Sequence, residues 1–185
     1  MDGFEKVPEQ WKSPRHAAPV LAIVMGLLWS AAFLCSMYGL SYPLLGIVGY
    51  VVALVSLLAF YNTLMNYRRF VVRLSATRTL QLAFGISLYG TLILTVAQYL
   101  YFAFLDRGRF LTAMYSAMEM PEMQEYMHQV LSPDVTVDMF MEQMGQVSVG
   151  VITFEMFFVN IILTGFAALL AGTLAGLSRL DGTRR

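Results

Sequence analysis

The sequence predicts an all-α integral membrane protein with four transmembrane helices, and two observations carry that prediction. Hydrophobic residues make up 58% of the 185 residues and charged residues only 13%, whereas roughly a quarter of the residues in soluble domains are charged. Four apolar segments, residues 18–40, 44–65, 79–105 and 147–177, are each long enough to cross a bilayer as a helix, which takes about 20 residues. Alternating strand-like patterns about 10 residues long are absent, so helices are the way to satisfy the backbone in lipid.

The connections between these segments differ in charge, and the difference predicts the topology. Ten of the twelve Lys and Arg residues lie in the leader 1–17, the loop 66–78 or the tail 178–185. Only Arg107 and Arg109 lie in the long remaining connection, residues 106–146. Because cytoplasmic loops are enriched in Lys and Arg, we expect both termini to be cytoplasmic and residues 106–146 to be extracytoplasmic.

The outer segment 106–146 is acidic and rich in methionine, with seven carboxylates and eight of the thirteen methionines. Pro121 suits the first turn of a helix, and Ser132-Pro133-Asp134 resembles a capped helix start. Apolar residues then recur at helical spacing on two stripes, Met123, Met127, Val130 and Leu131, and Val137, Phe140, Met141 and Met144. Such spacing is typical of amphipathic helices. We expect short helices packed on the outer membrane surface or on each other.

Four residues of this segment are candidates for a soft-metal site, namely Met120, Met123, Met127 and His128. Thioether sulfur suits Cu(I). However, Met123 and Met127 belong to an apolar stripe, and methionine commonly fills irregular packing surfaces. Packing is therefore the preferred interpretation, and the sequence assigns neither a metal nor a cofactor.

Three polar residues near the outer ends of the last two spans are functional candidates, Gln98, Glu155 and Asn160. Residues 156–177 alone can cross the bilayer, so Glu155 is expected at the outer boundary. There it could pair with Arg107 or Arg109. A hydrogen bond to Gln98 would likewise orient the third and fourth helices. The alternative is an ion or proton path through all three polar residues, although no second acid lies within a span to continue a relay.

Small residues and arginines mark two further features. Residues that let helices approach closely repeat every four positions, Ala22, Gly26 and Ser30 in the first span and Ala168, Gly172 and Gly176 in the last. They serve contacts within one bundle or between copies.

The loop 66–78 carries a basic patch, Arg68, Arg69, Arg73 and Arg78, which is expected to meet anionic lipid headgroups.

Catalysis and nucleic-acid binding are not expected. The chain has no G-x-S-x-G, H-E-x-x-H, P-loop or Gly-rich dinucleotide turn. Its two histidines, His16 and His128, fall on opposite sides of the membrane in the predicted topology. Nucleic-acid binding would require a larger basic domain than this chain offers.

Residues 99–110, YLYFAFLDRGRF, end the third span and follow a segment, 61–69, that contains tyrosine and arginine. The Met- and Glu-rich outer segment and a last helix rich in Gly and Ala complete the layout. Over most of residues 18–177 the chain resembles domain of unknown function 4199, small four-helix membrane proteins common in Bacteroidota. The resemblance implies a bacterial inner-membrane protein and brings no established activity.

The leading functional hypothesis is a non-enzymatic scaffold or accessory subunit that acts through its outer helices. An oligomeric transporter or channel using Glu155, Asn160 and Gln98 is the alternative, and a periplasmic soft-metal binder is the third. The expected partners are membrane lipid and either a second copy of the chain or another envelope protein.

Overall fold

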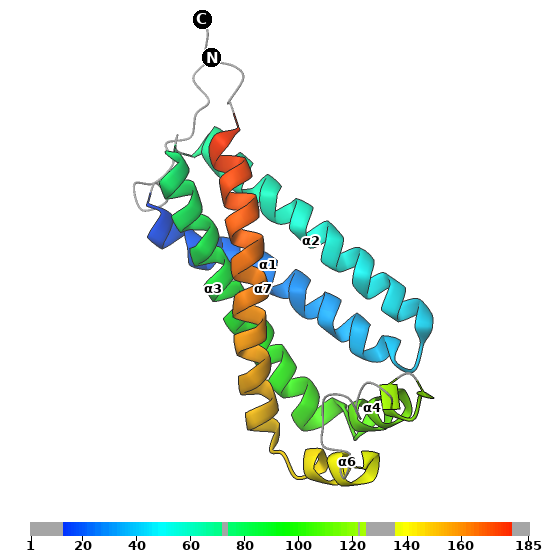
Figure 1. Ribbon diagram of the computed structural model, residues 1–185. Helices are drawn as coiled ribbons and strands as arrows, with labels where there is room; N and C mark the ends of the chain where they lie inside the picture. Colours follow the sequence, from blue (N-terminus) through cyan, green and yellow to red (C-terminus); the bar gives the residue numbers. More distant parts are fainter. Residues whose placement is uncertain (1–12, 72–73, 122, 125–135, 179–185) are drawn as a thin grey trace, which may run out of the picture.

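The computed structural model describes residues 13–71, 74–121, 123–124 and 136–178, and all its regular elements are helices. In chain order they are α1 (Pro14–Gly39), α2 (Pro43–Phe70), α3 (Ala76–Leu100), the π-helix η2 (Tyr101–Leu105), α4 (Arg109–Met118), α6 (Val137–Gly145) and α7 (Val149–Leu177). The described part of the chain has no strand, which confirms the predicted all-α class (Figure 1).

Within the described residues, four helices are long and apolar enough to cross a membrane: Pro14–Gly39, Pro43–Arg69, Ala76–Leu105 and Val149–Leu177. The third combines α3 with η2, which continues it. Their lengths of 26, 27, 30 and 29 residues exceed the roughly 20 residues that a hydrocarbon core requires. The four predicted spans are therefore confirmed.

Three helices extend beyond the apolar segments that predicted them, and α3 does so by beginning at Ala76 instead of residue 79. Helix α1 begins at Pro14, and α2 continues past Met65 to Phe70. Hydropathy ends where side chains become charged, whereas a helix ends only where its backbone hydrogen bonds are interrupted or capped. Proline occupies the first turn of both α1 and α2, where a missing N–H costs little. Consequently Arg68 and Arg69 lie in the last turn of α2, not in a loop.

Helix α3 is the centre of the bundle, because it packs against both α1 and α7. Helix α2 packs along α1 and reaches α7 at the end where α1 begins and α7 ends, which we call the terminal end (top of Figure 1). The opposite end, where α1 turns into α2 and α3 gives way to α4, is called the loop end (Figure 1).

The small-residue faces serve contacts within this bundle. A Cβ atom added to Gly26 of α1 would lie 2.7 Å from the Cβ of Ile93 on α3. On α7, a Cβ on Gly172 would lie 2.9 Å from Leu80 Cδ1, also on α3. Both faces therefore bring a neighbouring helix close to α3, as small residues do in membrane bundles. The sequence left open whether these two glycines pack within one chain or between copies. In the structure both pack within one chain.

Large apolar side chains remain exposed along the outer faces of α2 and α7. Leu44 is 77% exposed, and Ile162 is 70% exposed. Leaving such surfaces in water would be costly, and soluble monomers rarely expose contiguous apolar patches larger than a few hundred Å². These faces are suited to contact lipid, so the chain is a multi-pass membrane protein.

Helices α4 and α6 lie side by side at the loop end (Figure 1). After α4 the backbone amides of Met123 and Gln124 both donate to Met120 O at 3.0 Å, so a helical turn restarts at Pro121 as expected. Helix α6 starts at Val137 and is capped by Thr136. Its apolar stripe forms the half-buried side of the helix, at Val137, Phe140, Met141 and Met144. Ser132-Pro133-Asp134 and the stripe residues Met127, Val130 and Leu131 lie outside the described residues.

Candidate functional site

A tight turn connects the third span to α4, and Asp106 stabilises this turn. In the π-helix before it, the amide of Asp106 donates to Tyr101 O at 2.9 Å, five residues back. The buried Asp106 carboxylate then accepts hydrogen bonds from the backbone amides of Gly108 and Phe110, each at 3.0 Å. These amides open α4 and have no partner within the helix, so the carboxylate caps it.

The backbone of this turn adopts left-handed angles at two consecutive residues, with φ of 49° at Arg107 and 79° at Gly108. Glycine adopts such angles without steric cost, whereas a residue with a Cβ is strained there. Nothing lies within 4 Å of a Cβ added to Gly108, so the conformation and not the space selects glycine. The reversal redirects the chain from the bundle into α4.

Aromatic contacts fix the start of α4 to the membrane bundle. The rings of Phe102 and Phe110 lie 5.6 Å apart in an edge-to-face arrangement. The ring of Tyr101 is packed edge-on against Phe33 of α1 at 5.5 Å. Arg109 Cζ lies 5.5 Å from the centre of the Tyr38 ring, within the range of a cation–π interaction. Helix α4 is thus attached to both α1 and η2.

Helices α4 and α6 are joined by a hydrogen bond from the Tyr115 hydroxyl to Asp138 Oδ1, at 3.0 Å. This hydrogen bond and the negative charge of Asp138 raise the pKa of Tyr115. Because the neutral phenol is the donor, the contact is present at neutral pH and is lost as pH rises through the raised pKa. We call residues 106–120, which comprise the turn, α4 and the two residues after it, together with α6 the outer platform, because they lie outside the four-helix bundle.

The outer platform presents acidic and methionine side chains. Glu119 and Glu142 are exposed, and Met120 and Met139 are 58% and 52% exposed. Neither α4 nor α6 has a fully buried residue. Beside it, a cavity of about 440 Å³ separates α4 from the α1–α2 turn and is lined in part by Leu40, Arg109 and Thr112. The surface therefore combines exposed acids, exposed methionines and a depression.

The four soft-metal candidates are only partly described. Met120 and Met123 are exposed at the end of α4 and in the turn after it. Met127 and His128 lie outside the described residues. Soft-metal binding therefore stays a prediction.

The structure brings two of the three intramembrane candidates together. Asn160 Nδ2 of α7 donates to Gln98 Oε1 of α3 at 2.9 Å, and Gln98 is 3% exposed. Glu155 is exposed, and it has no hydrogen-bond or ion-pair partner among the described residues. The expected Glu155–Gln98 and Glu155–arginine contacts are thus not formed, because Glu155 lies on a different face of α7 from Asn160.

A second polar contact between the same helices was not expected from the sequence. The hydroxyls of Thr91 and Thr164 lie 2.8 Å apart. Thr164 also donates to Asn160 O, one turn earlier in α7, at 2.8 Å. The spacing along the helices could have predicted it. Thr91 is two turns before Gln98 and Thr164 is one turn after Asn160, so each pair shares a helix face.

The predicted basic patch is divided by the structure. Arg69 and Arg78 are exposed, and Arg73 lies outside the described residues. Arg68, in contrast, is only 7% exposed, and its Nη1 donates to the carbonyl of Ser178, just after α7, at 3.4 Å. Arg68 is therefore not exposed alongside Arg69 and Arg78, and the contact of the basic patch with lipid headgroups stays a prediction. A cation beside the last carbonyls of a helix is favourable, so Arg68 joins the end of α2 to the end of α7.

Four membrane-spanning helices with a structured platform at one end define a polytopic α-helical membrane protein. The sequence model of DUF4199, described as a protein of unknown function, matches residues 21–175. The chain belongs to this family. No curated protein and no solved structure matches it.

Proposed function

We propose that the chain is a non-catalytic protein of a bacterial inner membrane, with both termini cytoplasmic, that binds another envelope protein through its outer platform. In this role it is a scaffold or an accessory subunit. The partner is expected to present basic and apolar side chains, which complement the acids and methionines of the platform.

The attachment of the outer platform to the bundle is the observation that carries the proposal. Asp106 caps α4, aromatic rings hold its first turn against α1 and η2, and Tyr115 joins it to α6. A surface preorganised in this way loses little conformational entropy on binding. The amphipathic stripe of α6 is already used for packing, which leaves Met139 and Glu142 exposed.

Site-specific photocrosslinking in intact cells tests the proposal. A photoreactive amino acid in place of Met139, on α6, is expected to form an adduct with one envelope protein. The control replaces Ile162, an apolar residue on the outer face of α7 that is 70% exposed against 52% for Met139, and should label lipid. Glu142→Lys should weaken the Met139 adduct by reversing one charge. Adducts from Met139 with lipid or with the chain itself alone would refute the proposal.

The transport alternative has weaker support from the geometry. The side chains of Gln98 and Asn160 form a hydrogen bond with each other, and Glu155 lies on a different face of α7. A proton or ion path needs a continuous series of polar groups. Liposomes that contain wild-type protein or Glu155→Gln should therefore show the same proton and cation flux. A flux that depends on Glu155 would favour the transporter.

A further inference from the structure

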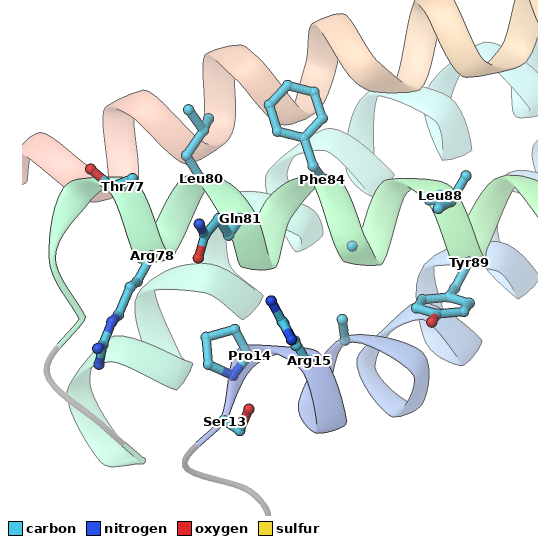
Figure 2. Close-up of a pocket in the computed structure, with 12 residues that line it drawn as sticks. Ser13, Pro14, Arg15, Thr77, Arg78, Leu80, Gln81, Phe84, Leu88 and Tyr89 are labelled. Carbon is cyan, nitrogen blue, oxygen red and sulfur yellow. The ribbon is translucent and has the colours of Figure 1, made fainter.

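A groove of about 960 Å³ lies at the terminal end of the bundle, between the start of α1 and the first half of α3 (Figure 2). Ala18 and Gly85 bring the two helices together there, since a Cβ on Gly85 would lie 2.8 Å from the Cβ of Ala18. These small side chains leave space that longer residues around them enclose. The groove is separate from the outer platform, which is at the loop end.

The chemistry of the groove changes along its length. Its end nearest the helix starts is polar and carries Ser13, Arg15, Thr77, Arg78 and Gln81. Figure 2 shows Arg15 reaching from α1 toward α3, with Gln81 on the facing helix, and Arg78 extending from α3 toward the level of Pro14. Further along α3 the lining becomes apolar at Phe84 and Leu88. The ten residues from Arg78 to Leu88 span about 15 Å at 1.5 Å per residue.

The two arginines lack carboxylate partners in the described part of the chain. Both are exposed, and neither guanidinium has an ion pair or hydrogen bond there. The described carboxylates are all located in the outer segment or near the start of α7, at Asp106, Glu119, Asp138, Glu142 and Glu155. Among the described residues, the polar end of the groove therefore carries two positive charges with no carboxylate paired to them. The N-termini of α1 and α3, which begin beside it, add to that charge.

We infer that this groove binds an anionic glycerophospholipid, with the phosphate between Arg15 and Arg78 and an acyl chain along α3 past Phe84 and Leu88. Guanidinium groups match phosphate oxygens as bidentate donors. Basic pockets between transmembrane helices bind lipid headgroups in the same manner. A free phosphate would use only the polar end, whereas a phospholipid matches the charged and the apolar parts together. In the topology proposed above, the lipid belongs to the cytoplasmic leaflet.

Native mass spectrometry of the full chain in mild detergent tests the site, with phosphatidylglycerol and phosphatidylcholine supplied in equal amounts. Phosphatidylglycerol should be retained selectively. Each of Arg15→Gln and Arg78→Gln should reduce that selectivity about 5-fold, and the double variant about 25-fold, since one basic contact contributes about 1 kcal/mol. Arg69→Gln is the matched control, because Arg69 is exposed at the same end of the bundle but does not line the groove.

Three results would overturn the inference. Equal retention of the two lipids would show that headgroup charge is not recognised. An equal loss in Arg69→Gln would indicate general attraction to a basic surface. Displacement of phosphatidylglycerol by inorganic phosphate would identify a soluble-anion site instead, and failure to displace it supports the lipid. Unchanged thermal unfolding of the four variants establishes that they are folded.

Discussion

The hydrogen bond between Gln98 and Asn160 joins α3 to α7, as does the contact between the hydroxyls of Thr91 and Thr164. It is 2.9 Å long, and Gln98 is almost fully buried. A side-chain amide left without a partner in lipid is costly, so each residue stabilises the other. Their pairing gives both residues a structural explanation that requires no transported solute.

A double-mutant cycle at Gln98 and Asn160 should show a favourable coupling energy of about 0.6 kcal/mol and at most about 1.7 kcal/mol, the range measured between membrane helices. Leucine replaces both residues, because it removes the hydrogen bond with little change in volume. Unfolding in mixed detergent micelles measures the free energies. Thr91→Val with Thr164→Val, across the same helix pair, provides a second cycle for comparison. A coupling energy of zero for Gln98 and Asn160 would contradict the structure.

At the scale of elements, the π-helix and the turn after it determine where the outer platform lies. The extra residue in the π-turn changes the direction in which Asp106 points, and its carboxylate reaches the first amides of α4. Arg107 and Gly108 then reverse the chain with positive φ angles. The platform therefore depends on a few backbone hydrogen bonds and on one glycine.

Asp106→Ala should destabilise α4 by about 0.5–2 kcal/mol, the usual effect of removing a helix cap. Hydrogen exchange of the α4 amides would then accelerate, while exchange in α7 stays unchanged. Asp106→Asn is the matched control, because its remaining oxygen still accepts one of the two hydrogen bonds and should restore part of the protection. If alanine and asparagine accelerated exchange equally, the capping role would be refuted.

Two glycines of α7 differ in their surroundings and give a matched test of helix packing. A Cβ on Gly172 would meet Leu80 Cδ1 at 2.9 Å and Ala83 Cβ at 3.0 Å, whereas a Cβ on Gly165 would meet only Phe84 Cε1, at 3.9 Å. Gly172→Ala should therefore destabilise the protein by about 1–3 kcal/mol through overpacking. Gly165→Ala should be neutral or stabilise by up to about 1 kcal/mol, since alanine favours the helix. Thermal unfolding in detergent compares them, and equal effects would contradict the predicted α3–α7 contact.

At the scale of the whole molecule, charge is distributed asymmetrically between the two ends of the bundle. Among the described residues the terminal end carries Arg15, Arg68, Arg69 and Arg78, and the loop end carries the carboxylates together with Arg107 and Arg109. Positively charged residues are retained on the cytoplasmic side during membrane insertion. The same asymmetry explains why an anionic lipid is proposed at one end and a protein partner at the other.

The topology can be measured by cysteine labelling in a Cys35→Ala background. Ser116→Cys, on the exposed side of α4, should react with a membrane-impermeant maleimide added to cells whose outer membrane has been permeabilised. Asn66→Cys, exposed near the end of α2, should react only after the inner membrane is opened. The reverse pattern would refute the proposed orientation.

The candidate sites were predictable only in part, because residue identity does not specify which helix faces meet. Gln98 and Asn160 were identified as candidates, but the orientation of α7 decides that Asn160, and not Glu155, reaches Gln98. Arginine is usually exposed at the protein surface, yet the extension of α2 brings Arg68 to Ser178. Similarly, Arg15 and Arg78 belong to different segments of the sequence and border one groove only because α1 and α3 begin side by side.

The amino-acid sequence alone predicts the four membrane spans, the all-α class, the family and the apolar stripe of α6. These features depend on hydropathy, proline positions and helical spacing, which act within each segment. Four further features depend on how the helices pack: the central position of α3, the capped turn at Asp106, the hydrogen bond between Gln98 and Asn160, and the basic groove. Those features require distant segments to meet, and that meeting depends on the shapes of whole helix faces packing together in lipid.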